Sequence, residues 1–196
     1  MTCIIGYKDK KNNKVYIGAD SCVGNSLGKH TLGENYKIFK PSKNKNILIA
    51  MSGSVRALQV LKYQMDFPSE NELIGQEEEF NEKYIVTKII PKLQRVCDDQ
   101  KVLEKDWVCL YFLIAYKDKL WKISGDFAVL EYTDEYLSEG SGFAYAEGSL
   151  HTTKDMDMSI EDKILMGLKA GCIDKSVAPP FFILNTKDDE VIKKEN

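Results

Sequence analysis

The stretch TCIIGYKDKKNNKVYIGAD, residues 2–20, predicts two strands joined by a turn. Residues 3–7 form an apolar run, residues 14–19 alternate apolar with other side chains, and the segment between them is polar turn material. An antiparallel hairpin returns its second strand beside the start of its first. We therefore expect Asp20 to lie near Thr2.

Thr2 is the residue that follows Met1. Removal of Met1 makes Thr2 the N-terminal residue. Its hydroxyl can then attack a carbonyl carbon while its own α-amine, with a reference pKa of about 7.7–8.0, accepts the proton. If Met1 is retained, this nitrogen is an amide and cannot act as a base. The competing interpretation is that Thr2 simply begins a strand, and the hairpin alone does not decide between the two.

The composition bounds the class of protein. The chain has 196 residues, of which 43% are hydrophobic, and this predicts a single domain spanning residues 1–196. The formal net charge is -3 with acidic and basic residues interspersed, so no basic stripe is available for nucleic acid. No apolar run is long enough to cross a bilayer, and the first residues lack the layout of a signal peptide. We therefore expect no membrane association and a cytoplasmic location.

Cysteine and histidine usage narrows the chemistry. The five cysteines include no Cys-x-x-Cys pair, which indicates reduced thiols in a chain without an export signal. Neither His30 nor His151 has a second histidine or a cysteine pair near it, so the sequence predicts no zinc site. We expect no metal and no cofactor, and a hydrolase would have to work without a histidine base.

The rest of the chain alternates groups of strands with pairs of helices. Ser52-Gly53-Ser54 joins a strand to a helix and would put backbone N–H groups at the start of that helix. Pro91 lies inside a helical pattern and predicts a kink or break near Ile90. This order predicts two packed sheets with helix layers outside them. We expect strands at residues 36–39, 47–51, 107–115, 120–123, 127–131, 181–184 and 191–192, and helices at residues 55–65, 84–97, 143–150 and 159–172.

A threonine nucleophile needs a cation that lowers the cost of its alkoxide, a carboxylate that orients this cation, and N–H donors for the oxyanion. The chain has one candidate for each role. Lys37 begins the third strand, Asp20 ends the second, and Gly53 lies at the strand-to-helix turn. Each also has a structural interpretation, because charged pairs near strand ends and turn glycines are common.

Six segments carry this pattern along nearly the whole chain. They are Thr2 to Gly6, Gly18 to Ser21, Lys37-Ile38, Met51 to Gly53, Gly140 to Ala146, and Asp174 before the last strands. Their ordered combination resembles the β-type subunits of the proteasome family, including the bacterial proteasome-like peptidases. The resemblance implies the fold of N-terminal-nucleophile hydrolases, an α+β four-layer αββα sandwich of two antiparallel sheets flanked by helices.

The resemblance also implies a role for each matching residue. Thr2 would be the nucleophile and, through its amine, the base. Lys37 would lower the pKa of the Thr2 hydroxyl, and Asp20 would keep Lys37 charged and oriented. The Gly53 N–H would form the oxyanion hole.

Three further positions match less central roles. Ser141 and Asp174 would form hydrogen bonds around the Thr2 amine, and Met51 would help to shape the specificity pocket. The chain also departs from the family pattern, because Cys22 replaces a basic residue and the sequence after Asp174 is Lys175-Ser176-Val177-Ala178-Pro179-Pro180.

The function implied by the resemblance is a threonine endopeptidase that hydrolyses peptide bonds of a polypeptide substrate through Thr2 after removal of Met1. It would act in a homo-oligomeric ring, with an ATPase unfoldase as partner. Two alternatives stay open. One is a catalytically silent ring or scaffold subunit that retains Met1, and the other is a small-molecule amidase with the same fold.

Overall fold

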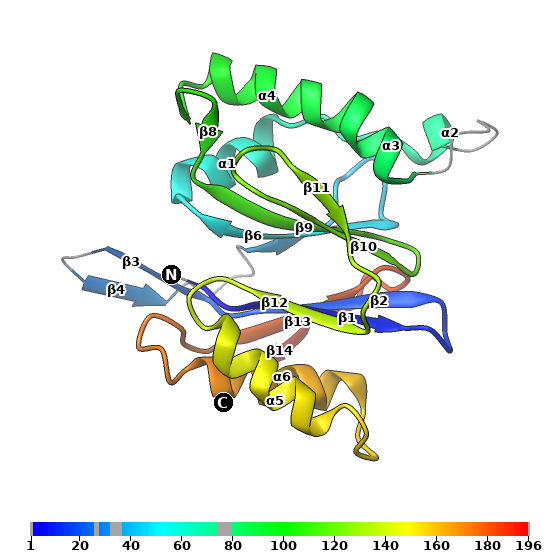
Figure 1. Ribbon diagram of the computed structural model, residues 1–196, viewed down its shortest axis with the longest axis vertical. Helices are drawn as coiled ribbons and strands as arrows, with labels where there is room; N and C mark the ends of the chain where they lie inside the picture. The colour runs from blue at the N-terminus through cyan, green and yellow to red at the C-terminus, as the bar shows by residue number, and fades with distance from the viewer. Residues whose placement is uncertain (1, 26–27, 32–36, 74–79, 196) are drawn as a thin grey trace.

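The computed structural model describes residues 2–25, 28–31, 37–73 and 80–195, and it has four layers (Figure 1). Two five-stranded antiparallel sheets pack face to face, and helices cover the outer face of each sheet. This arrangement confirms the predicted αββα sandwich.

The first sheet is built on the predicted hairpin. β1 and β2 pair in antiparallel register from Ile4 opposite Ala19 to Asp9 opposite Lys14. β12 joins β1 on one side, and the C-terminal strands join β2 on the other. In the order β12-β1-β2-β13-β14, the strands are β12 (Tyr136–Glu139), β1 (Ile4–Asp9), β2 (Lys14–Ala19), β13 (Phe181–Asn185) and β14 (Ile192–Lys194).

The second sheet has β9 at its centre. Its inward and outward side chains are all apolar, with Leu113 and Ala115 facing the other sheet and Phe112 and Ile114 facing the helices. β9 is thus buried on both of its faces. In the order β11-β10-β9-β6-β5, the strands are β11 (Val129–Glu131), β10 (Lys119–Ile123), β9 (Leu110–Tyr116), β6 (Ile47–Gly53) and β5 (Ile38–Phe39).

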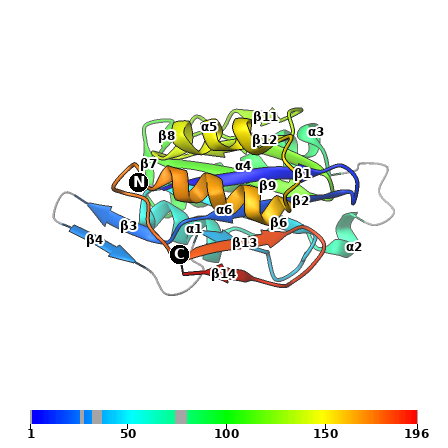
Figure 2. The ribbon, with the colours of Figure 1, turned by 90° about the horizontal axis from the view of Figure 1, so that it is seen from below.

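Helices form the two outer layers. On the second sheet they are α1 (Val55–Gln64), α2 (Glu70–Leu73), α3 (Glu82–Tyr84), the π-helix η1 (Ile85–Ile89) and α4 (Ile90–Asp99). On the first sheet they are α5 (Phe143–Thr153) and α6 (Ile160–Gly171), which lie side by side across it (Figure 2). The side chain of Ser159 caps α6 by accepting a hydrogen bond from the Asp162 N–H.

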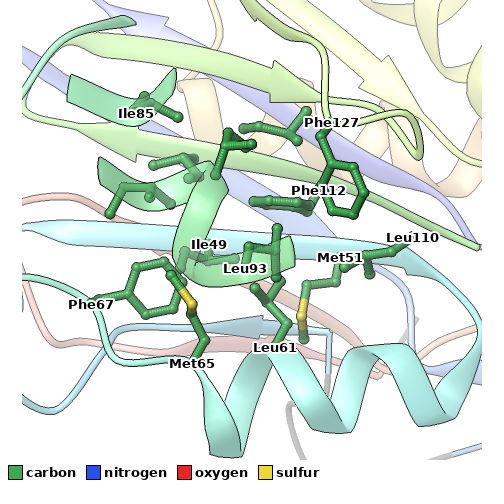
Figure 3. Close-up of a cluster of buried hydrophobic side chains, with 14 of the residues drawn as sticks. Ile49, Met51, Leu61, Met65, Phe67, Ile85, Leu93, Leu110, Phe112 and Phe127 are labelled. Carbon is green, nitrogen blue, oxygen red and sulfur yellow. The ribbon is translucent and has the colours of Figure 1, made fainter. Parts of the chain in front are cut away.

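Three apolar layers hold the sandwich together. One lies between the sheets, one lies between the first sheet and α5 with α6, and the largest lies between the second sheet and α1 with α4. Figure 3 shows part of the largest layer, where Leu61 from α1 and Leu93 from α4 meet Ile49 and Met51 from β6. Both faces of each sheet are therefore covered, which is why β1 is buried along its whole length.

Pro91 has a different effect from the predicted kink or break. The helix continues through residues 82–99, and one π-helical turn, η1, precedes the proline, where the Ile90 N–H donates to the Ile85 carbonyl. Because Pro91 has no N–H and its ring crowds the preceding turn, a wider turn relieves the clash without ending the helix.

The other differences concern short elements. The sequence did not indicate β12, whose residues contain no continuous apolar run, or two small ribbons. These ribbons are β3 (Cys22–Asn25) with β4 (Gly28–Thr31), which projects from the body (Figures 1 and 2), and β7 (Leu103–Glu104) with β8 (Trp107–Val108). The single strand expected at residues 107–115 is divided at Cys109 into β8 and β9. β11 begins two residues later than expected because Phe127 lies in a turn with a φ of 67°. Tyr36, expected to begin a strand, lies outside the described residues.

Candidate active site

The Asp20 carboxylate is the centre of the candidate site. It follows β2 and lies beside the start of β1, as the hairpin predicts, and its side chain is fully buried. Its Oδ1 accepts hydrogen bonds from the Cys3 N–H at 2.9 Å and from Lys37 Nζ at 2.6 Å. Its Oδ2 accepts from the N–H groups of Cys22 at 2.9 Å and Ala178 at 3.4 Å. One carboxylate, at the end of β2, therefore joins the starts of β1, β3 and β5 and the segment before β13.

The Lys37 ammonium is buried in this site, with 2% of its side chain exposed. Burial lowers the pKa of Lys37, and the charge of Asp20 beside it opposes that effect. A buried ammonium without a carboxylate partner is costly, so the pairing with Asp20 is what allows a cation to sit among apolar strands. The structure thus brings together the two charged residues that the sequence suggested.

A glycine-rich loop, residues 140–142, encloses the backbone of Thr2. The Thr2 N–H donates to Ser141 Oγ at 3.2 Å, and the Thr2 carbonyl accepts from the Gly142 N–H at 3.2 Å. Gly140 has a φ of 97°, and a Cβ on it would lie 2.3 Å from the Thr2 carbonyl oxygen. Only glycine fits this close approach, so the loop is matched to Thr2 by both conformation and space.

Ser176 extends this contact to Asp174. Ser141 Oγ lies 2.8 Å from Ser176 Oγ, and the Ser176 hydroxyl and N–H donate to Asp174 Oδ1 at 2.6 and 2.8 Å. These hydrogen bonds from Ser176 lower the pKa of the Asp174 carboxyl. The sequence suggested Ser141 and Asp174 but missed Ser176. An Asp-x-Ser spacing, which favours a local side-chain turn, was the available signal.

The segment after Ser176 has a structural role that its unusual sequence did not reveal. Ser21 donates its N–H to the Ala178 carbonyl at 3.1 Å, and its hydroxyl donates to the Pro180 carbonyl. With the Ala178 N–H bound to Asp20, the segment before β13 is fixed to the end of β2. The departure from the family pattern therefore keeps a direct contact with Asp20.

Gly53 ends β6 beside Lys37. The Ser54 N–H donates to the Cys109 carbonyl, and the Met51 N–H donates to the Lys37 carbonyl, each at 2.8 Å. Because successive N–H groups of a strand point to opposite edges, the Gly53 N–H lies on the same edge as that of Met51, away from β9. Gly53 has a φ of 133°, and a Cβ there would lie 2.2 Å from the Cys109 carbonyl oxygen.

Met51 lies in the apolar layer beneath this edge. Its side chain is fully buried among Leu61, Leu93 and Leu110, between the second sheet and its helices (Figure 3). Its role in a specificity pocket stays a prediction.

The cysteines are all free thiols. Cys3, next to Thr2, is fully buried, and burial raises its pKa, which disfavours the thiolate. Within the ranges that the structure describes, no group of three or more His, Cys, Asp or Glu side chains could hold a metal ion. No helix in the described part of the chain is long and apolar enough to span a membrane.

Two antiparallel sheets between helix layers, with a threonine at the start of the first strand and a lysine–aspartate pair beside it, define the N-terminal-nucleophile hydrolase fold. No protein-family model and no curated protein matches the sequence. Solved structures do match, and they are proteasome-like peptidases. The chain therefore has the proteasome-like form of this fold, as its motifs predict.

Three of these structures illustrate the similarity. BPH of Thiobacillus denitrificans, in complex with epoxomicin, has a TM-score of 0.73 and 17% identity, over 94% of this chain and 97% of that one. HslV of Trypanosoma brucei has a TM-score of 0.66 and 15% identity, over 94% and 98%. An Anbu mutant from Hyphomicrobium sp. strain MC1 has a TM-score of 0.68 and 12% identity, over 98% and 86%.

Proposed function

We propose that this chain is a threonine peptidase whose nucleophile is the Thr2 hydroxyl, exposed as an N-terminal residue by removal of Met1. The observation that carries the proposal is the buried Asp20 carboxylate, which binds both the N–H next to Thr2 and the Lys37 ammonium. A structural ion pair alone would not need to be tied to the backbone at the first strand residue. The loop around Thr2 adds a polar partner for its nitrogen.

The catalytic cycle needs no group beyond the chain and water. The Thr2 α-amine accepts the hydroxyl proton as Oγ attacks the peptide carbonyl, and the Lys37 ammonium stabilises the developing alkoxide. The Gly53 N–H is suited to the oxyanion because it lies on the edge of β6 that faces away from β9, beyond the last residues that pair with β5. The amine then passes the proton to the leaving nitrogen, and water hydrolyses the Thr2 ester by the same steps in reverse.

Ser141 has a defined part in this proposal. In the structure its hydroxyl accepts the Thr2 N–H, and it would keep the same neighbour when that nitrogen becomes an amine. Through Ser176 it is connected to the Asp174 carboxylate, which can balance the positive charge that the amine acquires when it takes the proton. We infer that these three side chains orient the base.

The assembly belongs to the same proposal. An N-terminal threonine attacks peptides without much selectivity, and enclosure in a homo-oligomeric ring, of the kind implied by the resemblance to HslV and Anbu, would restrict it to unfolded polypeptides. An ATPase unfoldase would supply such substrates.

Intact mass of the purified, assembled protein tests the first step. The expected mass is that of the chain without Met1. A protein that assembles with Met1 in place contradicts the proposal, because its Thr2 nitrogen is an amide, and it favours the silent subunit instead.

Covalent labelling tests the nucleophile. Epoxomicin, the ligand of the similar BPH structure, is expected to add to the peptide that begins with Thr2. Thr2→Ala should abolish labelling and turnover, whereas Thr2→Ser, which keeps a hydroxyl and an amine, should keep both in reduced form. Labelling that survives Thr2→Ala removes Thr2 from the mechanism. Degradation of an unfolded polypeptide such as casein separates a peptidase from a small-molecule amidase.

A further inference from the structure

A second ion pair joins the two sheets at the same end of the sandwich. The Lys122 ammonium on β10 contacts the Glu139 carboxylate at the end of β12. β10 and β12 belong to facing sheets (Figure 1), and both side chains are more than two-thirds buried. Burial of a charged pair carries a desolvation penalty, and apolar side chains would fill this layer at a lower free-energy cost. The pair is therefore not explained by stability alone.

The strand registers locate this pair relative to Thr2. Glu139 lies opposite Ile4 on β1, and side chains two residues apart share a face, so Glu139 points between the sheets as Leu137 does. Lys122 likewise shares the face of Leu120. The pair therefore lies between the sheets at the level of Ile4, two residues after Thr2 in the chain. Asp20 and Lys37 make the matching bridge on the other side of β1.

Glu139 makes a second contact with the carboxylate oxygen that does not face Lys122. Its Oε1 accepts a hydrogen bond from the N–H of Gly140 at 3.1 Å, while Oε2 faces Lys122. Gly140 is the residue whose positive φ brings the loop against the Thr2 carbonyl, and Ser141 and Gly142 then bind the nitrogen and the carbonyl of Thr2. The carboxylate thus holds the first residue of the loop that holds Thr2.

We propose that Glu139, oriented by Lys122, is a positioning residue that fixes the 140–142 loop and thereby the Thr2 nitrogen. Lys122 fixes the carboxylate with one oxygen aimed at the Gly140 N–H. The expected effect on kcat rests on the proposed function, whereas the role of Glu139 in placing the loop does not depend on that function.

Kinetics of the ring with Met1 removed test the consequence. Glu139→Ala is expected to lower kcat about 10- to 100-fold with KM unchanged, because the base is displaced while substrate contacts remain. Glu139→Gln keeps an acceptor for Gly140 and should recover most of the loss. The exchanged pair Lys122→Glu with Glu139→Lys restores the charges but offers Gly140 no acceptor, so it should stay as slow as Glu139→Ala.

The matched control is Glu135→Ala. Glu135 immediately precedes β12, at the opposite end of this strand from Glu139, and its carboxylate accepts a hydrogen bond from the Tyr7 hydroxyl. Its removal therefore deletes a carboxylate contact at the end of β12 that is away from the loop. It should leave kcat unchanged. If the exchanged pair recovers kcat, or if Glu139→Ala lowers only the melting temperature, Glu139 has a structural role and the proposal is overturned.

Hydrogen exchange separates this inference from the proposed function. Glu139→Ala should speed exchange at the Gly140 and Gly142 amides by about fivefold or more, since Gly140 loses its acceptor and the loop no longer holds Gly142 against the Thr2 carbonyl, and Glu135→Ala should not. If the wild-type protein lacks Met1 yet is inert, the proposed function fails while this measurement still decides the positioning role. Unchanged exchange in Glu139→Ala refutes the positioning role even in an active enzyme.

Discussion

The Asp20–Lys37 pair predicts an asymmetry between its two deletions. In Asp20→Asn the buried Lys37 ammonium loses its carboxylate, and the amide has one acceptor oxygen where the carboxylate had two. In Lys37→Met the carboxylate keeps three backbone N–H donors, from Cys3, Cys22 and Ala178. Each substitution leaves one buried charge without its counter-charge, but the carboxylate in Lys37→Met keeps three hydrogen bonds, whereas the ammonium in Asp20→Asn has only a neutral amide oxygen beside it.

The magnitudes follow from this difference. Removal of one partner from a buried ion pair typically costs about 3–5 kcal/mol, and we expect Asp20→Asn to fall in this range. Lys37→Met should cost about 1–3 kcal/mol, the range for the loss of a hydrogen bond to a charged group that stays otherwise satisfied. For a chain of this length the first corresponds to a fall in melting temperature of about 6–20 °C.

Urea unfolding at neutral pH, followed by circular dichroism, measures both free energies of unfolding in variants that also carry Thr2→Ala to prevent self-cleavage. In the protein that retains Thr2, each of the two single substitutions should abolish turnover. If Lys37→Met destabilises as much as Asp20→Asn, the backbone donors contribute little to holding the carboxylate, and the argument that Asp20 is the centre of the site is refuted.

Three further predictions concern the loop and its partners. Gly140→Ala should lower turnover more than 100-fold and destabilise the protein by about 1–3 kcal/mol, because the positive φ and the Thr2 carbonyl leave no room for Cβ; normal kcat would show that the loop tolerates a shift. Ser141→Ala and Ser176→Ala should be coupled by at least about 0.5 kcal/mol in a double-mutant cycle on kcat, since their hydroxyls lie 2.8 Å apart; additive effects would separate Ser176 from the site. Hydrogen bonds from Ser176 lower the pKa of Asp174, so their contribution to stability is present above the ordinary aspartate pKa and is lost as pH falls through the lowered value. The stability difference between wild type and Ser176→Ala, measured by thermal unfolding, should therefore be greatest near neutral pH and shrink in acid; a constant difference would rule out Asp174 as the cause.

The hairpin and the charged pair could be predicted because their signals are local. An apolar run, a polar turn and an alternating run place Asp20 beside Thr2 through antiparallel pairing alone. The order of strands and helices then indicates the layers.

The features that the sequence did not indicate depend on contacts between distant segments. β12 is a strand because β1 offers it an edge, not because Tyr136–Glu139 has a strand pattern of its own. The three backbone donors to Asp20 carry no side-chain signal. Ser176 gains its role only when Ser141, from a separate loop, lies beside it. Glu139 gains its role only when the start of β1, more than 130 positions earlier in the chain, lies beside the 140–142 loop.

The Asp20 carboxylate also determines when the site can exist. Its hydrogen-bond donors come from residues 3, 22, 37 and 178, and the last of these precedes β13, which pairs with β2. During synthesis from the N-terminus, a chain that stops before residue 178 already contains Thr2 but lacks one of the hydrogen-bond donors to the Asp20 carboxylate. If the chain is the proposed peptidase, it would gain activity only at the end of folding, after its own polypeptide has ceased to be an unfolded substrate.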